Sequence, residues 1–180
     1  QTTINFSKDW KLLTHTTILD YRWLSKPTIK ILGMNMSISF LADQLIASNA
    51  RVEFNGGLDI RLVTEKNIEK IKQLKLKCIH FAFDRYQDKK VIMRNLKLFK
   101  EKTGYNKDKG RIMVYILCNY DTNLSQDIER IQFCRELRFS PFPMIYDKEH
   151  ADPIYRDLQR WCNNFIFWKV PTFEEYKGGV

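Results

Sequence analysis

Residues 78–118 read CIHFAFDRYQDKKVIMRNLKLFKEKTGYNKDKGRIMVYILC, and this stretch decides the fold class. Two short apolar runs rich in β-branched and aromatic residues, Cys78–Phe83 and Ile112–Cys118, predict strands. Between them the pattern predicts a helix over Asp88–Thr103, with Asp88 as its N-cap and Gly104 placed to end it. The apolar residues on one stripe of this helix are Ile92, Leu96 and Phe99.

The same alternation of apolar runs and amphipathic helices extends in both directions along the chain. Further strands are predicted at Ile29–Leu32, Arg51–Phe54, Phe142–Tyr146 and Phe165–Trp168. Further helices are predicted at Lys8–His15, at Ser39–Ser48, from the cap Thr64 to Leu74, from Asn123 or Ser125 through Leu137, and after Asp152-Pro153. Pro143 indicates that its strand lies at an edge of the sheet or starts there.

Continuous apolar strands separated by helices predict an α/β fold with a largely parallel sheet and right-handed crossovers. Such a sheet is either open and doubly wound or part of a (β/α) barrel. We expect one domain over residues 1–180. Within it, residues 1–28 are poorly defined by pattern, residues 29–168 carry the βα repeats, and residues 169–180 form a C-terminal tail.

The composition excludes several classes of protein. With 44% hydrophobic residues the chain can form a core, so disorder and low complexity are excluded. No apolar run approaches the roughly 18 residues of a membrane-spanning helix. The first ten residues lack a signal-peptide pattern, and the four cysteines are dispersed, so reduced thiols in a cytoplasmic protein are predicted.

Polar side chains follow each predicted strand within a few residues. In a parallel sheet the carboxyl ends of the strands share one edge, where ligands bind, so these side chains are expected to form a common site. Turn chemistry alone is the competing explanation. Asp59 and Arg61 point the same way in an extended segment, and either pair with each other or bind a ligand carboxylate and amine. The candidate site residues are Asn35, Asn55, Asp59, Arg61, Asp84 and Asn119.

Catalytic and metal-binding motifs are not found in the sequence. No GxGxxG, GxxxxGK[ST], HExxH or GxSxG occurs, so no catalytic residue is assigned and no metal site is predicted. His80 shares one face of its strand with Asp84, and is either a hydrogen-bonded core histidine or a catalytic base. His15 and His150 show no ligand spacing.

The basic excess, 30 Lys and Arg against 21 Asp and Glu, gives a net charge of +9 and is concentrated in one segment. Lys89–Arg111 carries nine basic residues against Glu101 and Asp108. This segment is either a solvated helix face or a patch that binds nucleic acid or an acidic protein partner. In the second case the protein is a binding module without catalytic activity. No membrane partner is predicted.

Four segments together resemble the later part of the radical S-adenosylmethionine (radical SAM) proteins of bacteria and phages. They read VEFNGGLDIRLVTEKNIEKIKQLKLKCIHFAFDRYQDK, YILCNYDTNLSQDIERI, FSPFPMIYDKEHADPIYRDLQRWCNN and VPTFEEY. The resemblance implies a partial (β/α) barrel in which the runs from Ile29 onward are strands two to six. It also implies cofactor contacts from the six candidate site residues, with S-adenosylmethionine beside a [4Fe-4S] cluster.

The chain departs from that family where the cluster is held. CxxxCxxC does not occur, so the resemblance implies no cluster in this chain alone, and no activity without further protein. The chain would then be a fragment, a split protein completed by an upstream segment or partner chain, or a degenerate homologue. An uncovered parallel edge beside Ile29–Leu32 would need the N-terminal segment, a partner or a second copy to cover it.

Overall fold

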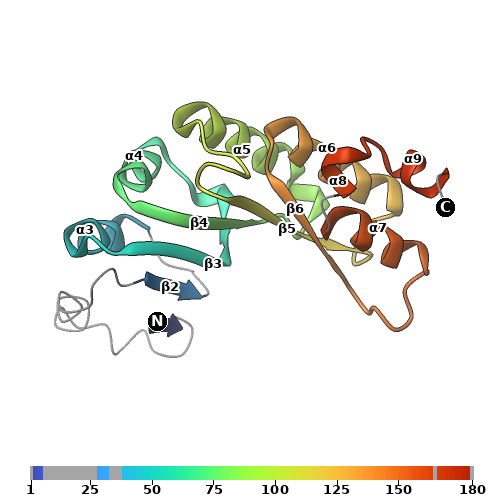
Figure 1. The fold of residues 1–180 in the computed structure, drawn as a ribbon, viewed down its shortest axis with the longest axis horizontal. Coiled ribbons are helices and arrows are strands. Elements are labelled where there is room, and N and C mark those ends of the chain that lie inside the picture. Colours follow the sequence, from blue (N-terminus) through green and yellow to red (C-terminus); the bar gives the residue numbers. More distant parts are fainter. Residues whose placement is uncertain (1, 6–27, 33–37, 164–165, 179–180) are drawn as a thin grey trace.

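The computed structural model describes residues 2–5, 28–32, 38–163 and 166–178 of the chain (Figure 1). The helix predicted at Lys8–His15 and the candidate site residue Asn35 lie outside these residues. Within the described residues no helix has both the length and the apolar character needed to cross a membrane.

The strands form one parallel sheet of six, in the order in which they occur along the chain. They are β1 (Thr2–Asn5), β2 (Thr28–Leu32), β3 (Arg51–Asp59), β4 (Lys75–Ala82), β5 (Ile112–Cys118) and β6 (Ser140–Ile145). The predicted α/β fold with a parallel sheet is therefore confirmed. The sheet does not close, so the partial barrel stays a prediction. The N-terminal segment covers the edge of β2, because β1 pairs with it from Thr2 opposite Ile29.

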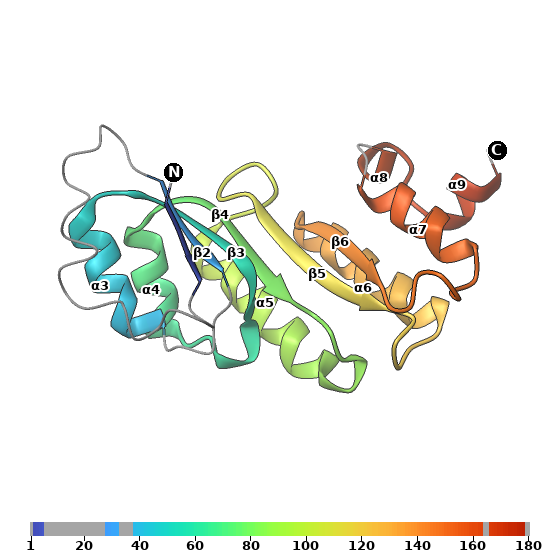
Figure 2. The same ribbon diagram turned by 90° about the horizontal axis from the view of Figure 1, so that it is seen from below.

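Four helices connect consecutive strands from β2 onward: α3 (Ile38–Ser48), α4 (Glu65–Gln73), α5 (Lys89–Thr103) and α6 (Leu124–Leu137). Right-handed crossovers between strands in sequential order place every connecting helix on the same face of the sheet. Figure 2 shows α4, α5 and α6 behind the strands in this way. After β6 come α7 (Ile154–Asn163), α8 (Ile166–Lys169) and α9 (Phe173–Gly178), which gather at the β6 end of the molecule (Figure 1).

Thr64, Asn123 and Gly104 bound helices as predicted, whereas Asp88 precedes α5 without a capping hydrogen bond and accepts from Arg61 instead. The Thr64 hydroxyl accepts a hydrogen bond from the backbone N–H of Asn67 at 3.2 Å, and Asn123 forms a reciprocal capping box with Gln126 at 3.0 Å in both directions. Gly104 ends α5 in the left-handed conformation, with φ of 66°.

The core lies between the sheet and its helices. Along β5 every second side chain is fully buried: Ile112, Val114, Ile116 and Cys118. These side chains share the core with Leu96 and Phe99 of α5 and Ile131 and Cys134 of α6. Met113, Tyr115 and Leu117 point to the opposite face and are half-buried. At its β6 end this face meets α7 and α8, because Met113 lines one pocket with Cys162 and Asn163 of α7 and Trp168 of α8.

Strand β3 is longer than predicted. It continues through Gly56-Gly57 to Asp59, although the apolar run ends at Phe54. The pairing with β4 shifts register between Phe54 and Leu58, and Gly57 takes a positive φ of 25°. A Cβ atom at Gly57 would lie 3.1 Å from Cδ2 of Tyr115, so glycine lets the strand pass this ring.

The strand predicted at Phe165–Trp168 is wrong, because residues 166–169 form helix α8. A seventh strand would have to pair with β6, and Pro141 and Pro143 of β6 cannot donate backbone hydrogen bonds to it. The aromatic residues of this run instead pack on α7, with the rings of Phe167 and Trp161 5.0 Å apart. Pro143 does lie on the last strand of the described sheet, as predicted.

Candidate functional site

A pocket of about 220 Å³ opens where β3 and β4 end. Its charged lining residues are Asp59, Arg61, Asp84, Arg85 and Asp88. Gly57, Ala82 and Ile92 complete the lining. The pocket lies at the carboxyl ends of parallel strands, which is the edge at which α/β proteins bind ligands.

Asp59 and Arg61 pair with each other inside this pocket. The Arg61 Nε and Nη2 atoms donate to the two Asp59 carboxylate oxygens at 2.8 and 2.7 Å, and Nη1 donates to Asp88 at 2.6 Å. The Arg61 side chain holds the pKa of Asp59 below its ordinary value. Buried Asn95 fixes the same turn by donating to the Ile60 carbonyl at 3.0 Å. The sequence left two roles open for Asp59 and Arg61, which were to pair with each other or to bind a ligand. The structure shows that they pair with each other.

Asp84 differs from its neighbours because its carboxylate accepts no hydrogen bond from any described residue. It lies two residues beyond the end of β4 and lines the same pocket as Asp59 and Arg61. Removal from water raises the pKa of Asp84, although the positive charges of Arg130 and Arg61 oppose this effect. An ionised carboxylate with no donor can accept hydrogen bonds from a ligand.

Arg85, next to Asp84, supplies a positive charge that no carboxylate of the described residues pairs. When the Gln87 amide is turned so that its oxygen faces Arg85, that oxygen accepts hydrogen bonds of 2.9 and 3.0 Å from the guanidinium. This neighbour is neutral and leaves the charge of Arg85 uncompensated. The pocket therefore combines one available anionic group with one available cationic group.

Asn55 and Asn119 do not join the pocket. Asn55 lies within β3, where its amide donates to Glu53 at 3.3 Å and accepts from the Cys78 thiol at 3.2 Å. Asn119 follows β5 with φ of 61°, and its side chain donates to the Tyr146 carbonyl at 3.4 Å. Of the six candidate residues the structure brings together Asp59, Arg61 and Asp84.

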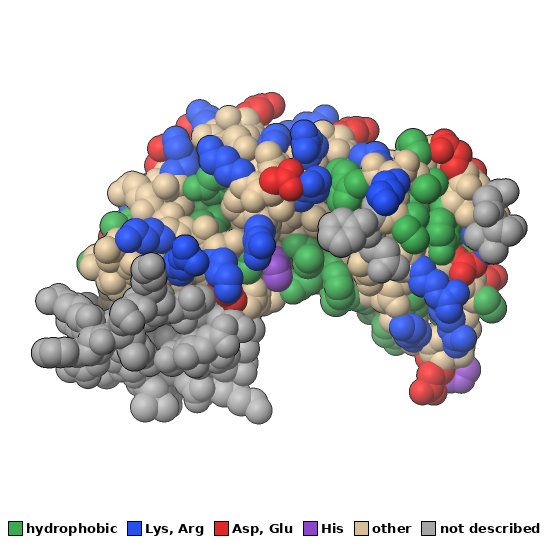
Figure 3. Space-filling view, in the orientation of Figure 1, with side chains coloured by type: hydrophobic (Ala, Val, Ile, Leu, Met, Phe, Trp, Pro, Cys, Tyr) green, Lys and Arg blue, Asp and Glu red, His purple; other side chains and the backbone are tan. Residues whose placement is uncertain are grey.

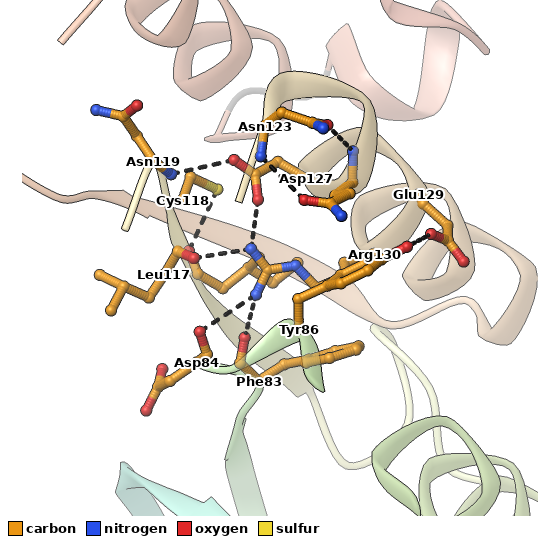
Figure 4. A network of polar contacts seen from close by, with 12 residues as sticks. Phe83, Asp84, Tyr86, Leu117, Cys118, Asn119, Asn123, Asp127, Glu129 and Arg130 are labelled. Atoms are coloured by element: carbon orange, nitrogen blue, oxygen red, sulfur yellow. Dashed lines mark hydrogen bonds and ion pairs between the residues drawn. The ribbon is translucent and has the colours of Figure 1, made fainter. Parts of the chain in front are cut away.

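A buried charged side chain that pattern reasoning missed supports the pocket at Asp84. Arg130 of α6 is fully buried and pairs with Asp127 (Figure 4). Its guanidinium also donates to the carbonyl of Phe83 at 2.7 Å and to that of Leu117 at 2.8 Å. Asp127 in turn accepts from the backbone N–H of Asn119 at 3.1 Å. Arg130 thereby holds the carboxyl ends of β4 and β5 together beside Asp84.

The spacing of residues in α6 carries the one signal that could have revealed this network. Asp127, Arg130, Ile131 and Cys134 share a stripe at helical spacing. Arginine and aspartate are rarely buried unless they pair, so the apolar pattern alone does not place either of them in the core. Their separation of three residues allows the pairing that makes burial tolerable.

The basic segment Lys89–Arg111 is largely engaged in contacts within the chain. Lys89 pairs with Glu129 at 2.9 Å, Lys102 with Glu65 at 3.3 Å, and Lys107 with Asp108 at 2.6 Å. In the view of Figure 3, acidic side chains lie between the basic ones over α4 and α5. Binding of nucleic acid or an acidic protein through this segment stays a prediction.

The described residues contain no group of three or more His, Cys, Asp or Glu side chains placed to hold a metal ion. His15 lies outside them, and exposed His150 contacts Asp147 at 2.8 Å. The four cysteines are free thiols, and three of them, Cys118, Cys134 and Cys162, are buried.

Comparison with known proteins gives one match. The model of a domain of unknown function (DUF4403) matches residues 1–71, which run from the N-terminus into α4. Neither the curated proteins nor the solved structures gave a match.

The resemblance to radical SAM proteins is wrong, because the family model that matches belongs to a different family and covers residues 52–62, the stretch VEFNGGLDIRL that opens the first of the four segments. Strands that end in Asn or Asp recur in parallel α/β proteins with many functions, so the segments that carried the resemblance are not specific. The expectations of S-adenosylmethionine and a [4Fe-4S] cluster rested on it and lose that support. The same holds for the cofactor contacts expected of the six candidate residues.

Proposed function

We propose that the protein binds a small zwitterionic ligand, of the size and charge of an amino acid, in the pocket between β3 and β4. The ammonium group would lie on the Asp84 carboxylate and the carboxylate on the Arg85 guanidinium. The observation that carries this proposal is the Asp84 carboxylate, which lies in the pocket and accepts no hydrogen bond from the described residues.

A comparison of Asp84 with Asp59 supports Asp84 as the contact for the ligand ammonium group. Asp59 accepts a bidentate hydrogen bond from Arg61, and its pKa is lowered. The pKa of Asp84 is instead raised by the removal of water, so the positive charges of Arg130 and Arg61 compensate this carboxylate only in part. A ligand ammonium group would supply the missing partner, and hydrogen bonds between charged groups are stronger than neutral ones.

The size of the pocket limits the ligand. A volume of about 220 Å³ is below the range of roughly 300–1,000 Å³ in which drug-sized ligands bind. The described lining contains carboxylate, guanidinium and aliphatic groups, which can contact the charged and the apolar parts of such a ligand. Four free thiols favour a reducing compartment such as the cytoplasm as the place where this binding occurs.

Replacing Asp84 with asparagine is expected to weaken binding of the best amino acid by about 10-fold or more, because one charge-assisted hydrogen bond is lost. Isothermal titration calorimetry with a panel of the common amino acids measures this effect. Asp121→Asn is the matched control, since Asp121 is exposed beyond β5 and does not line the pocket. Equal affinity in the wild type and Asp84→Asn, or no binding of any amino acid, would contradict the proposal.

A further inference from the structure

A second pocket, of about 450 Å³, opens where β3 and β4 begin, at the edge of the sheet opposite the pocket at Asp84. The residues that line it are Asn49, Arg51, Lys75, Leu76 and Lys77. This lining contains three cationic side chains and no acidic one, and it shares no residue with the pocket at Asp84. In Figure 3 a row of basic side chains lies over β3 and β4.

Two of the three cations lie directly opposite each other. Arg51 is the first residue of β3 and Lys75 the first residue of β4, and the two are partners in the parallel strand pair. Both residues are exposed, and neither forms an ion pair with a carboxylate of the described residues. Like charges in opposite positions of two strands repel each other. An anion that contacts both side chains would remove this repulsion.

The third cation, Lys77, reaches the pocket through an irregularity in the strand pair. The pairing of β3 with β4 shifts register directly after Val52, which makes Lys77 the extra residue of a bulge on β4. Lys77 forms an ion pair with Glu53, whose side chain is only 7% exposed and does not line the pocket. The charge of Lys77 is therefore compensated, and the charges of Arg51 and Lys75 are left for a ligand.

Two neighbouring positive charges match the charge of a phosphate monoester, which is about −1.5 to −2 at neutral pH. A guanidinium can donate two parallel hydrogen bonds to phosphate oxygens, and a lysine ammonium group contacts phosphate as a point charge. The pocket volume of about 450 Å³ lies in the range of roughly 300–1,000 Å³ in which small molecules bind. The described lining has no aromatic ring on which a base could stack, which disfavours single-stranded nucleic acid.

We propose that the pocket at the start of β3 and β4 binds a small phosphate monoester. The phosphate group would lie between Arg51 and Lys75, and the organic part would extend over Asn49 and Leu76. This site is independent of the zwitterion site proposed above, because the two pockets lie at opposite ends of the same strands.

Methyl phosphate and dimethyl phosphate test this proposal, because the diester carries one negative charge and the monoester close to two. NMR titrations at constant ionic strength follow the backbone amide signals of Arg51 and Lys75. Methyl phosphate is expected to bind about 10-fold more tightly than dimethyl phosphate, and Lys75→Gln should weaken its binding by about 10-fold, because one hydrogen bond between charged groups is lost. Lys66→Gln, an exposed position on α4 outside the pocket, should leave the affinity unchanged.

The stability of Lys75→Gln separates ligand binding from a structural role. Without ligand this variant should unfold at the same urea concentration as the wild type or at a higher one, because a repulsion is removed. A lower midpoint would overturn the proposal, since Lys75 would then stabilise the fold itself. Equal or absent binding of the two esters by the wild type, or tighter binding of the diester, would also overturn it. This comparison decides the question even if Lys75→Gln does not fold.

Discussion

Replacing Arg130 with methionine is expected to lower the free energy of unfolding by about 3–5 kcal/mol, the usual cost of breaking a buried ion pair from one side. Arg130 and Asp127 are both fully buried, so the substitution leaves the Asp127 carboxylate without its cation. The carbonyls of Phe83 and Leu117 lose their donors in the same step. Urea unfolding followed by circular dichroism measures the change.

The exposed pair Lys102–Glu65 provides the control for Arg130. Lys102→Met removes the same kind of charge from a solvated position and is expected to change stability by about 1 kcal/mol or less. A loss as small in Arg130→Met would show that Arg130 does not hold the ends of β4 and β5 together.

Replacing Trp161 with alanine is expected to cost about 3–5 kcal/mol, as for other buried large aromatic side chains. Trp161 of α7 is fully buried and contacts the rings of Phe167 in α8 and Phe173 in α9, with centroids 5.0 and 5.6 Å apart. Its indole N–H also donates to the Val170 carbonyl at 3.1 Å. The substitution therefore loosens both C-terminal helices at once. Thermal unfolding and proteolysis of the C-terminal segment measure the effect.

Tyr120 is the matched aromatic control for Trp161. It is 54% exposed and contacts only the edge of Tyr146 among the described aromatic rings. Tyr120→Ala should change the free energy of unfolding by about 1 kcal/mol or less. If Trp161→Ala were equally mild, the C-terminal helices would not depend on this ring.

The elements set by local pattern could be predicted from the sequence. The apolar run Ile112–Cys118 is a strand, and Thr64, Asn123 and Gly104 bound helices where their chemistry favours helix ends. The extension of β3 past Phe54 could not be predicted, because it depends on the Tyr115 ring that Gly57 passes. The same holds for α8, since it depends on the tertiary contact between fully buried Phe167 and Trp161 of α7.

The candidate site was predictable in part. Reading the residues after each strand found Asp59, Arg61 and Asp84, since parallel strands end at one edge. It placed Asn55 there wrongly, because β3 runs on for four residues beyond it. Arg85 was not among the candidate residues, and Arg130 was missed because pattern reasoning assigns charged side chains to the surface.

The raised pKa of Asp84 has a defined consequence for stability. A carboxyl whose folded pKa exceeds its ordinary value of 3.8 adds stability at lower pH, and this contribution is lost as the pH rises through the folded value. At neutral pH the ionised Asp84 carboxylate therefore adds nothing to the stability of the folded state. A ligand ammonium group that binds there should lower the same pKa.

The most direct test is a pH titration of the Asp84 carboxyl carbon by NMR, in the free protein and with the best-binding amino acid. We predict a midpoint above the ordinary value of 3.8 in the free protein and a lower midpoint when the ligand is bound. A midpoint at or below 3.8 in the free protein, or one that the ligand leaves unchanged, would contradict the assignment of Asp84 as the ammonium-binding group.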